Sequence, residues 1–208
     1  MYTPPHFLES RTEELQRLLR AHPLGLLVVN GPEGLDANHL PFLLDAGRGG
    51  HGVLLAHLAR ANPVWQQVAD GDAVLVVFRG AQGYVSPNWY PSKHEHHRHV
   101  PTWNYEAVHA HGRLRIRDDA TFVRGVVARL TREHEAGEPR PWKMGDAPAD
   151  YLDDLVTKIV GLEVEVTRWE GKRKLSQNRE ARDFEGVVEA LEARGDAGLA
   201  AAMREVDR

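Results

Sequence analysis

The sequence contains no cysteine and no long apolar run. The absence of cysteine excludes disulfides, thiolate metal sites and a cysteine nucleophile, and it is compatible with the cytoplasm, where we expect the protein. No apolar stretch approaches the length of a membrane-spanning helix, and residues 1–11 lack the apolar core of a signal peptide. We therefore expect no membrane association.

Several motifs of catalysis and recognition are also missing. The chain has no glycine-rich phosphate loop, no G-x-S-x-G nucleophile elbow and no H-E-x-x-H zinc helix. No segment is a convincing helix-turn-helix. The net charge of -4 and the pI of about 6.3 argue against a general electrostatic grip on nucleic acid. DNA is therefore a partner that neither charge nor motif supports.

The composition is that of one globular domain. A chain of 208 residues with 42% hydrophobic and 27% charged residues can bury a sizeable core. No repeat or long linker divides it, so we expect a single domain over residues 1–208 with a helical C-terminal segment from about residue 180. The 12 histidines make the charge of the protein depend on pH between about 5 and 8.

The stretch 83–105 concentrates aromatic residues. It holds Tyr84, Trp89, Tyr90, Trp103 and Tyr105, together with three prolines and four histidines. Proline fixes φ and removes a backbone donor, so an ordinary helix or central strand is excluded. Large amphipathic rings usually line a pocket or an interface. The pattern predicts an aromatic loop that two flanking strands present over a cavity.

The rest of the chain predicts short strands at close spacing, which is typical of an antiparallel meander. Strands are expected at 24–29, 35–44, 53–57, 73–78, 83–86, 107–117 and 162–169. Helices are expected at 11–22, 63–69, 118–134 and 149–159, with two more within 183–206. The predicted fold is mainly β: a closed or split antiparallel barrel decorated with helices.

Two segments have residue types suited to an anionic ligand. In 57–63, Asn62 and Pro63 start a helix, whose free N–H groups favour a phosphate, and Arg60 offers a bidentate contact. The alternative is that Asn62 only caps the helix and Arg60 is solvated. In 172–179, four cations and two amides suit a phosphate or ring carbonyls, and the alternative is a solvated basic turn.

The histidine run and a basic strand face could each have a function or a purely structural role. The histidines of 94–99 could bind zinc or copper, but the neighbouring cations oppose a metal ion, so we expect none. His109, His111, Arg113, Arg115 and Arg117 share one face of the expected strand 107–117. Such a stripe could follow a nucleic-acid backbone, although a plain solvent-facing strand is the simpler interpretation.

Six segments of the chain are distinctive when they are taken together. They are Met1–Pro4 with Phe7, Asn38–Pro41, His57–Pro63, Tyr84–Tyr90, Val100–Tyr105 and Lys174–Arg179. Together these segments resemble the PaiB family of FMN-binding negative transcriptional regulators. The resemblance covers nearly the whole chain in order, and one departure, Ala81 in place of an expected proline, affects only a turn.

The resemblance implies an FMN-binding split barrel similar to pyridoxamine-phosphate oxidases and flavin reductases, forming a homodimer with flavin near the subunit interface. It also implies that Arg60 and Asn62 hold the FMN phosphate. Asn38, His39 and Leu40 would then lie along the isoalloxazine ring. Residues that would close the pocket are Trp103, Lys174, Gln177 and Arg179.

Three functions compete at this point. The first is a PaiB-like regulator that binds FMN and represses protease or sporulation genes, directly or through a partner. The second is an FMN-dependent oxidoreductase with His39, Tyr90 or Trp103 lining the site. The third is haem or metal handling by the histidine-rich loop. We rank them in this order, and catalytic residues are not assigned.

Overall fold

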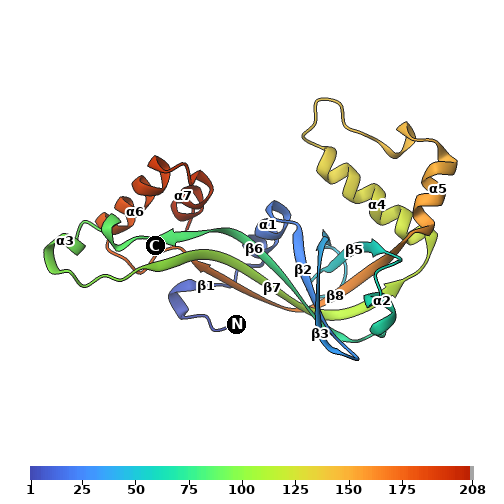
Figure 1. Cartoon of the computed structure of the whole chain (residues 1–208), viewed down its shortest axis with the longest axis horizontal. Helices are drawn as coiled ribbons and strands as arrows, with labels where there is room; N and C mark the ends of the chain where they lie inside the picture. The colour runs from blue at the N-terminus through green and yellow to red at the C-terminus, as the bar shows by residue number, and fades with distance from the viewer. Residues whose placement is uncertain (207–208) are drawn as a thin grey trace. The chain divides into compact units, whose positions relative to one another are not determined.

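The computed structural model describes residues 1–206 and consists of one eight-stranded antiparallel sheet with helices (Figure 1). Seven strands follow the order β3-β2-β6-β7-β8-β5-β4, and β1 pairs with β8. The strands are β1 (Leu8–Glu9), β2 (Leu24–Gly31), β3 (Gly34–Pro41), β4 (Leu43–Asp45), β5 (Val53–Ala59), β6 (Ala73–Val85), β7 (Thr102–Arg117) and β8 (Ile159–Lys174).

Five helices lie close to the predicted positions, α2 is shorter than predicted, and the single turn α3 and three short 3-10 helices were not predicted. The helices are α1 (Thr12–Ala21), α2 (Val64–Gln67), α3 (Lys93–His96), α4 (Ala120–Glu135), α5 (Ala149–Thr157), α6 (Ala181–Ala193) and α7 (Ala197–Arg204). The 3-10 helices are η1 (Pro5–Phe7), η2 (Pro87–Trp89) and η3 (Met144–Asp146). No helix within residues 1–206 has both the length and the apolar character needed to cross a membrane.

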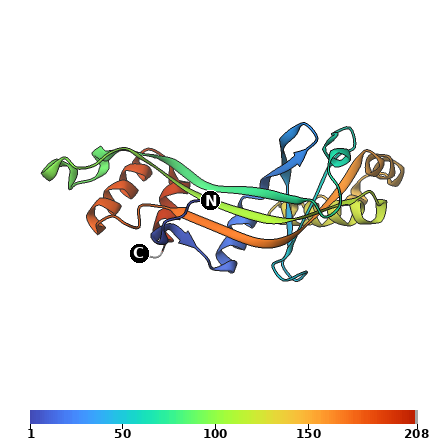
Figure 2. The ribbon, with the colours of Figure 1, turned by 90° about the horizontal axis from the view of Figure 1, so that it is seen from below.

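Strands β6 and β8 are much longer than the sequence predicts. The expected strands 73–78 and 83–86 are one continuous strand, β6, and β8 runs to Lys174 rather than ending near Trp169. Figure 2 shows β6, β7 and β8 running side by side. The glycines within β6 do not form a turn. A Cβ at Gly80 would lie 2.6 Å from the side chain of Leu18, so this glycine allows α1 to pack closely against β6.

Two further corrections concern the segments expected to bind a ligand. β7 begins at Thr102, so Trp103 and Tyr105 lie on a strand and not in the aromatic loop. Helix α2 is a single turn of four residues rather than the expected 63–69. A helix this short has only a small dipole, which weakens the argument for phosphate binding at its N-terminus.

The chain forms two compact units, each made of separate sequence segments. The first, which we call the α4 unit, comprises residues 19–78 and 109–169. Its core packs α4 on β4 and β5 through Leu43, Leu55, Val126 and Leu130. Asp119 caps α4, because its carboxylate accepts hydrogen bonds from the first backbone N–H groups of the helix.

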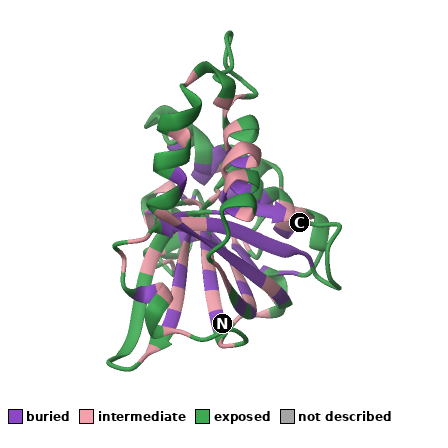
Figure 3. Cartoon of the chain, turned by 90° about the vertical axis from the view of Figure 1, so that its right-hand side faces the viewer, coloured by how far each residue is buried: buried purple, intermediate pink, exposed green. Residues whose placement is uncertain are grey.

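The second, the α6–α7 unit, comprises residues 1–18, 79–108 and 170 onward. Its core joins α6 and α7 to the ends of β6 and β8 through Val85, Leu175, Val187 and Met203. Figure 3 shows buried and part-exposed segments alternating along the strands, as side chains on successive residues point to opposite faces of a sheet.

Candidate functional site

Asn38 and Asn62 lie together in the α4 unit. Asn62 Nδ2 donates to Asn38 Oδ1 at 2.7 Å, and Asn62 Oδ1 accepts from the backbone N–H of Val64 at 3.0 Å. The amide of Asn62 therefore accepts from the first N–H of α2, whose N-cap is Pro63, and ties the turn before the helix to β3. His39 and Leu40 follow Asn38 on this strand; His39 is exposed and Leu40 is buried. The structure thus brings Asn62, expected at the phosphate, next to the strand that carries the three residues expected along the flavin ring.

Arg60 is engaged by its own chain. NH1 and NH2 donate to the two carboxylate oxygens of Asp118, Nε donates to the Thr157 carbonyl at 2.7 Å, and NH2 also reaches the Ile159 carbonyl at 3.3 Å. Four of the five N–H donors of the guanidinium therefore have partners. The Arg60 guanidinium holds the pKa of the Asp118 carboxyl below its usual range.

The surroundings of Arg60 do not favour an anion. Arg60 lines a cavity of about 490 Å³ together with Arg124, Asp118, Asp119 and Asp153. Arg124 is itself paired with Asp153. The lining thus carries three carboxylates against two guanidinium groups, so a phosphate here would have to displace Asp118 and would still face like charge.

A second group of site residues lies on one face of the sheet in the α6–α7 unit, which we call the aromatic–lysine face. Trp103 and Tyr84 are about half exposed, at 50% and 47%, and their ring centroids lie 6.5 Å apart. Lys172 Nζ lies 5.1 Å from the centroid of Tyr105. The face consists of Tyr84 on β6, Trp103 and Tyr105 on β7, and Lys172 and Lys174 on β8.

The ammonium group of Lys174 is held at the strand end. Its Nζ donates to the Trp103 carbonyl at 2.6 Å and to Thr102 Oγ1. Burial, with the charges of Lys172 and Arg179 nearby, lowers the pKa of Lys174. Within residues 1–206, Lys172 and Lys174 have no carboxylate partner. This face therefore carries uncompensated positive charge next to exposed aromatic rings.

Residues 175–179, which follow Lys174, form a turn that is held by hydrogen bonds within the segment. Ser176 has a φ of 66°, in the left-handed region, and Gln177 Oε1 accepts from the backbone N–H of Leu175 at 2.8 Å. Arg179 NH1 lies 3.4 Å from His99 Nδ1, and its guanidinium stands 5.0 Å from the centroid of the Tyr90 ring. Gln177 and Arg179 thus have structural roles close to the aromatic loop.

The aromatic loop is fastened to α6 by a buried polar network that the sequence did not reveal. Ser92 Oγ donates to Asp183 Oδ2 at 2.6 Å and lies 2.7 Å from His99 Nε2. Asp183 bonds the serine and not His99 Nδ1, and Ser92 is 1% exposed, so the three do not form a nucleophilic triad. His99 Nε2 also lies 3.6 Å from Asp183 Oδ2, and the His99 ring lies 5.0 Å from the ring of His96.

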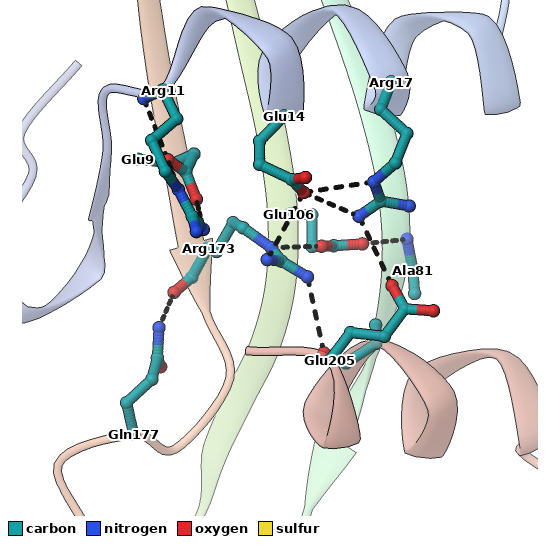
Figure 4. Close-up of polar contacts among 10 residues, drawn as sticks. Glu9, Arg11, Glu14, Arg17, Ala81, Glu106, Arg173, Gln177 and Glu205 are labelled. Atoms are coloured by element: carbon teal, nitrogen blue, oxygen red, sulfur yellow. Dashed lines mark hydrogen bonds and ion pairs between the residues drawn. The ribbon is translucent and has the colours of Figure 1, made fainter. Parts of the chain in front are cut away.

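A buried ion pair supports the back of the aromatic–lysine face (Figure 4). Arg173 lies between Lys172 and Lys174 and so points to the opposite side of β8. Its Nε donates to Glu106 Oε1 at 2.8 Å, and both side chains are almost fully buried. Nothing in the local sequence distinguishes these two residues, which lie far apart along the chain.

The arginine stripe on β7 is largely neutralised. Arg115 NH2 lies 3.3 Å from Glu165 Oε2, and Arg117 NH1 lies 3.9 Å from Glu163 Oε2. Arg113 donates to the carbonyl of Gly71 at 3.1 Å. The plain strand face is therefore the simpler interpretation of the stripe.

The aromatic–lysine face has groups that suit a flavin mononucleotide better than the surroundings of Arg60 do. A flavin phosphate needs hydrogen-bond donors and positive charge, and its ring needs apolar or aromatic surface. The aromatic–lysine face offers both. The donors of Arg60 are occupied, so that residue fits the phosphate poorly as the structure stands.

Comparison with known proteins settles the family. Residues 1–168 match the model of the family described as "Putative FMN-binding domain". The chain belongs to this FMN-binding family. The predicted family and the predicted cofactor, FMN, are thereby confirmed at the level of the family.

Relatives share most of the length of the chain. An uncharacterised protein of Emericella nidulans is 33% identical over 95% of this chain and 93% of its own length. The Bacillus subtilis protein named "Protease synthase and sporulation protein PAI 2" is 29% identical over 92% of this chain and 89% of its own.

Solved structures confirm the predicted split barrel. The flavocytochrome Anf3 of Azotobacter vinelandii has a TM-score of 0.59 with this chain, and the similarity covers 86% of this chain and 75% of that one at 12% identity. An identity this low shows the fold alone. The mainly β, antiparallel, helix-decorated split barrel expected from the sequence is therefore correct.

Proposed function

We propose that this FMN-binding protein is a PaiB-like negative regulator of transcription, of the kind that controls protease or sporulation genes. The observation that carries the proposal is the similarity over 92% of the chain to the Bacillus subtilis protein whose name refers to protease synthesis and sporulation. Bound FMN would supply reversible electron-transfer chemistry. The chain's own residues would bind the flavin and hold its ring and anionic group.

An indirect route to repression has more support than direct DNA reading. The arginines of the β7 stripe contact glutamates and a backbone carbonyl, and the net charge of the chain is -4. Non-specific DNA binding needs a basic surface, because the attraction to phosphates supplies most of its free energy. We therefore propose that repression passes through a protein partner or through the flavin chemistry.

Two measurements test this function. The first is the visible absorption spectrum of the freshly purified protein, with mass spectrometry of the compound released on denaturation. FMN is expected, and a protein that neither carries nor takes up FMN contradicts the proposal. The second is binding to its own promoter fragment at modest salt. Binding no stronger than to random DNA is expected, and a specific complex would establish direct repression.

The second candidate is an FMN-dependent oxidoreductase. What favours it is the half-exposed Trp103, since an indole left uncovered beside two lysines leaves surface for a further molecule. Bleaching of the bound flavin by NADH or NADPH would support this function. A flavin that no physiological donor reduces would count against it.

A further inference from the structure

A cavity of about 450 Å³ lies between the C-terminal half of α4 and the loop that follows this helix, and we call it the Trp142 cavity. Figure 1 shows the chain leaving the end of α4 and returning to α5. All the lining residues fall within 128–144, a range that belongs to the α4 unit and contains none of the residues expected to bind FMN. The volume is within the range of about 300–1,000 Å³ that is usual for small-molecule sites.

One stripe of α4 forms the first wall of the cavity. Its members lie three or four residues apart and therefore share one face of the helix: Ala128, Thr131, Arg132 and Glu135. The apolar residues that α4 packs on β4 and β5 lie on the opposite face. The wall is thus a surface of α4 that the sheet does not cover, and the single methyl group of Ala128 takes up little of its space.

The second wall is a loop that its own hydrogen bonds hold in place. Glu135 Oε2 accepts from the backbone N–H of Trp142 at 2.8 Å, which fastens the loop to the end of α4. The backbone N–H of Lys143 donates to Asp146 Oδ2 at 2.9 Å, and the N–H of Asp146 donates back to the Lys143 carbonyl at 2.8 Å. The loop is therefore ordered before any ligand arrives, which lowers the entropic cost of binding.

The lining combines apolar surface with positive charge. Pro141, Trp142 and Met144 supply the apolar part, and Trp142 is 42% exposed. An indole that borders a cavity in this way offers a flat surface against which an aromatic ring can pack. Arg132 and Lys143 lie in the same lining, and neither side chain has a carboxylate partner among residues 1–206.

The balance of charge in this lining favours an anion. In the described chain the lining holds one carboxylate, that of Glu135, and the N–H of Trp142 already occupies one of its oxygens. The two cations outnumber it, so a ligand with one negative charge would neutralise the cavity. The guanidinium of Arg132 can hold a carboxylate with two hydrogen bonds, and the ammonium of Lys143 can add a third.

We propose that the Trp142 cavity binds a small aromatic carboxylic acid, with its ring against Trp142 and its carboxylate at Arg132 and Lys143. The proposal does not depend on FMN binding or on a role in transcription, because the cavity is built from other residues. It gives the protein a second small-molecule ligand, and with it a means of responding to the level of an aromatic acid.

The test uses β-naphthoate as the probe and β-naphthamide, which has the same shape without the charge, as its neutral counterpart. Dissociation constants are measured by titration calorimetry on the full chain with FMN in excess, so that the probe does not compete for a flavin site. The wild type should prefer the acid by at least about tenfold, because hydrogen bonds between charged groups are the stronger ones. The indole N–H signal of Trp142, identified in heteronuclear NMR spectra by its loss in Trp142→Ala, should shift during the titration.

Four variants locate the contacts. Arg132→Gln and Lys143→Gln should each reduce the preference for the acid by about three- to tenfold and leave the affinity for the amide unchanged. Trp142→Ala should weaken the binding of both compounds by at least about fivefold. Ala128→Leu fills the cavity with a good helix former, so it should abolish both without lowering the Tm. Arg140→Gln is the matched control, since Arg140 belongs to the same loop and does not line the cavity.

Three results would overturn the proposal. The first is equal affinity of the wild type for acid and amide, or binding of neither at millimolar concentration. The second is binding of the probe that Ala128→Leu leaves intact, since the probe then occupies another place. The third is a lower sedimentation coefficient in Ala128→Leu with no response to the probe in the wild type, which would identify a second copy of the chain as the occupant. None of these results bears on FMN binding, which the absorption spectrum tests.

Discussion

Neutralising the buried carboxylate of Glu106 should destabilise the protein strongly. Glu106→Gln keeps the shape of the side chain and the hydrogen bond that its Oε2 accepts from the backbone N–H of Ala81 at 3.3 Å. It leaves the guanidinium of Arg173, which is 2% exposed, without its buried counter-charge. Breaking one partner of a buried pair costs about 3–5 kcal/mol.

The other contacts of Arg173 set the range within this estimate. Glu14 Oε2 lies 3.9 Å from NH1, and the Ala202 carbonyl lies 3.5 Å from NH2. These groups are farther away than the 2.8 Å contact with Glu106, so they compensate only partly. We expect the lower half of the range, about 3–4 kcal/mol.

The assay is urea unfolding at neutral pH, followed by both tryptophan fluorescence and far-ultraviolet circular dichroism. Lys158→Ala, which breaks an exposed ion pair with Asp154, is the control and should cost about 0–1 kcal/mol. The double variant Glu106→Leu/Arg173→Met should cost much less than the sum of its single variants, because no unpaired charge stays buried. A loss below about 1 kcal/mol in Glu106→Gln would refute the reasoning.

Three further outcomes follow from the structure. Gly186→Ala should destabilise by about 1–3 kcal/mol, because its Cβ would collide with the carbonyl of η2, whereas Gly198→Ala on α7 meets open space and should be neutral or stabilising in the same unfolding assay. Burial raises the pKa of Asp183, but two hydrogen bonds from Ser92 lower it by more, so the pKa lies below its ordinary value. Asp183 thus contributes stability above its ordinary pKa, which is lost as the pH falls through the lowered value; the stability difference between wild type and Asp183→Asn should shrink in acid, and a constant difference contradicts this. Asp119→Ala should cost about 1 kcal/mol, measured as a lower Tm, because α4 loses its N-cap; an unchanged Tm contradicts this.

The sequence predicts most of the secondary structure where local rules decide it. Asp119 with the following apolar periodicity predicts α4, and the break at residues 194–196 separates α6 from α7. The prediction fails for β6 because glycines usually mark turns, whereas Gly80 and Gly83 lie against leucines from two helices. Only the folded chain shows that these helices leave no room for side chains.

The candidate site shows the same limit. Family motifs single out Asn38, Asn62, Trp103 and Lys174, and the structure pairs the two asparagines and joins Lys174 to the Trp103 carbonyl. The partner that occupies Arg60 is not predictable, because a residue 58 positions away supplies it. The roles of the predicted site residues and the homodimer stay predictions; sedimentation analysis tests the latter.

Because each compact unit is made of separate segments of the sequence, truncating the chain can remove part of a unit. The family match ends at residue 168, yet the α6–α7 unit takes its last segment from residue 170 onward. A protein cut at the end of the match would lose Arg173, Lys174 and both final helices, leaving Glu106 buried opposite nothing and an apolar strand end open to water. Residues 1–168, which match the family model, are therefore not expected to fold alone. A chimera made from two relatives has to include the C-terminal segment after residue 168 together with the matched region.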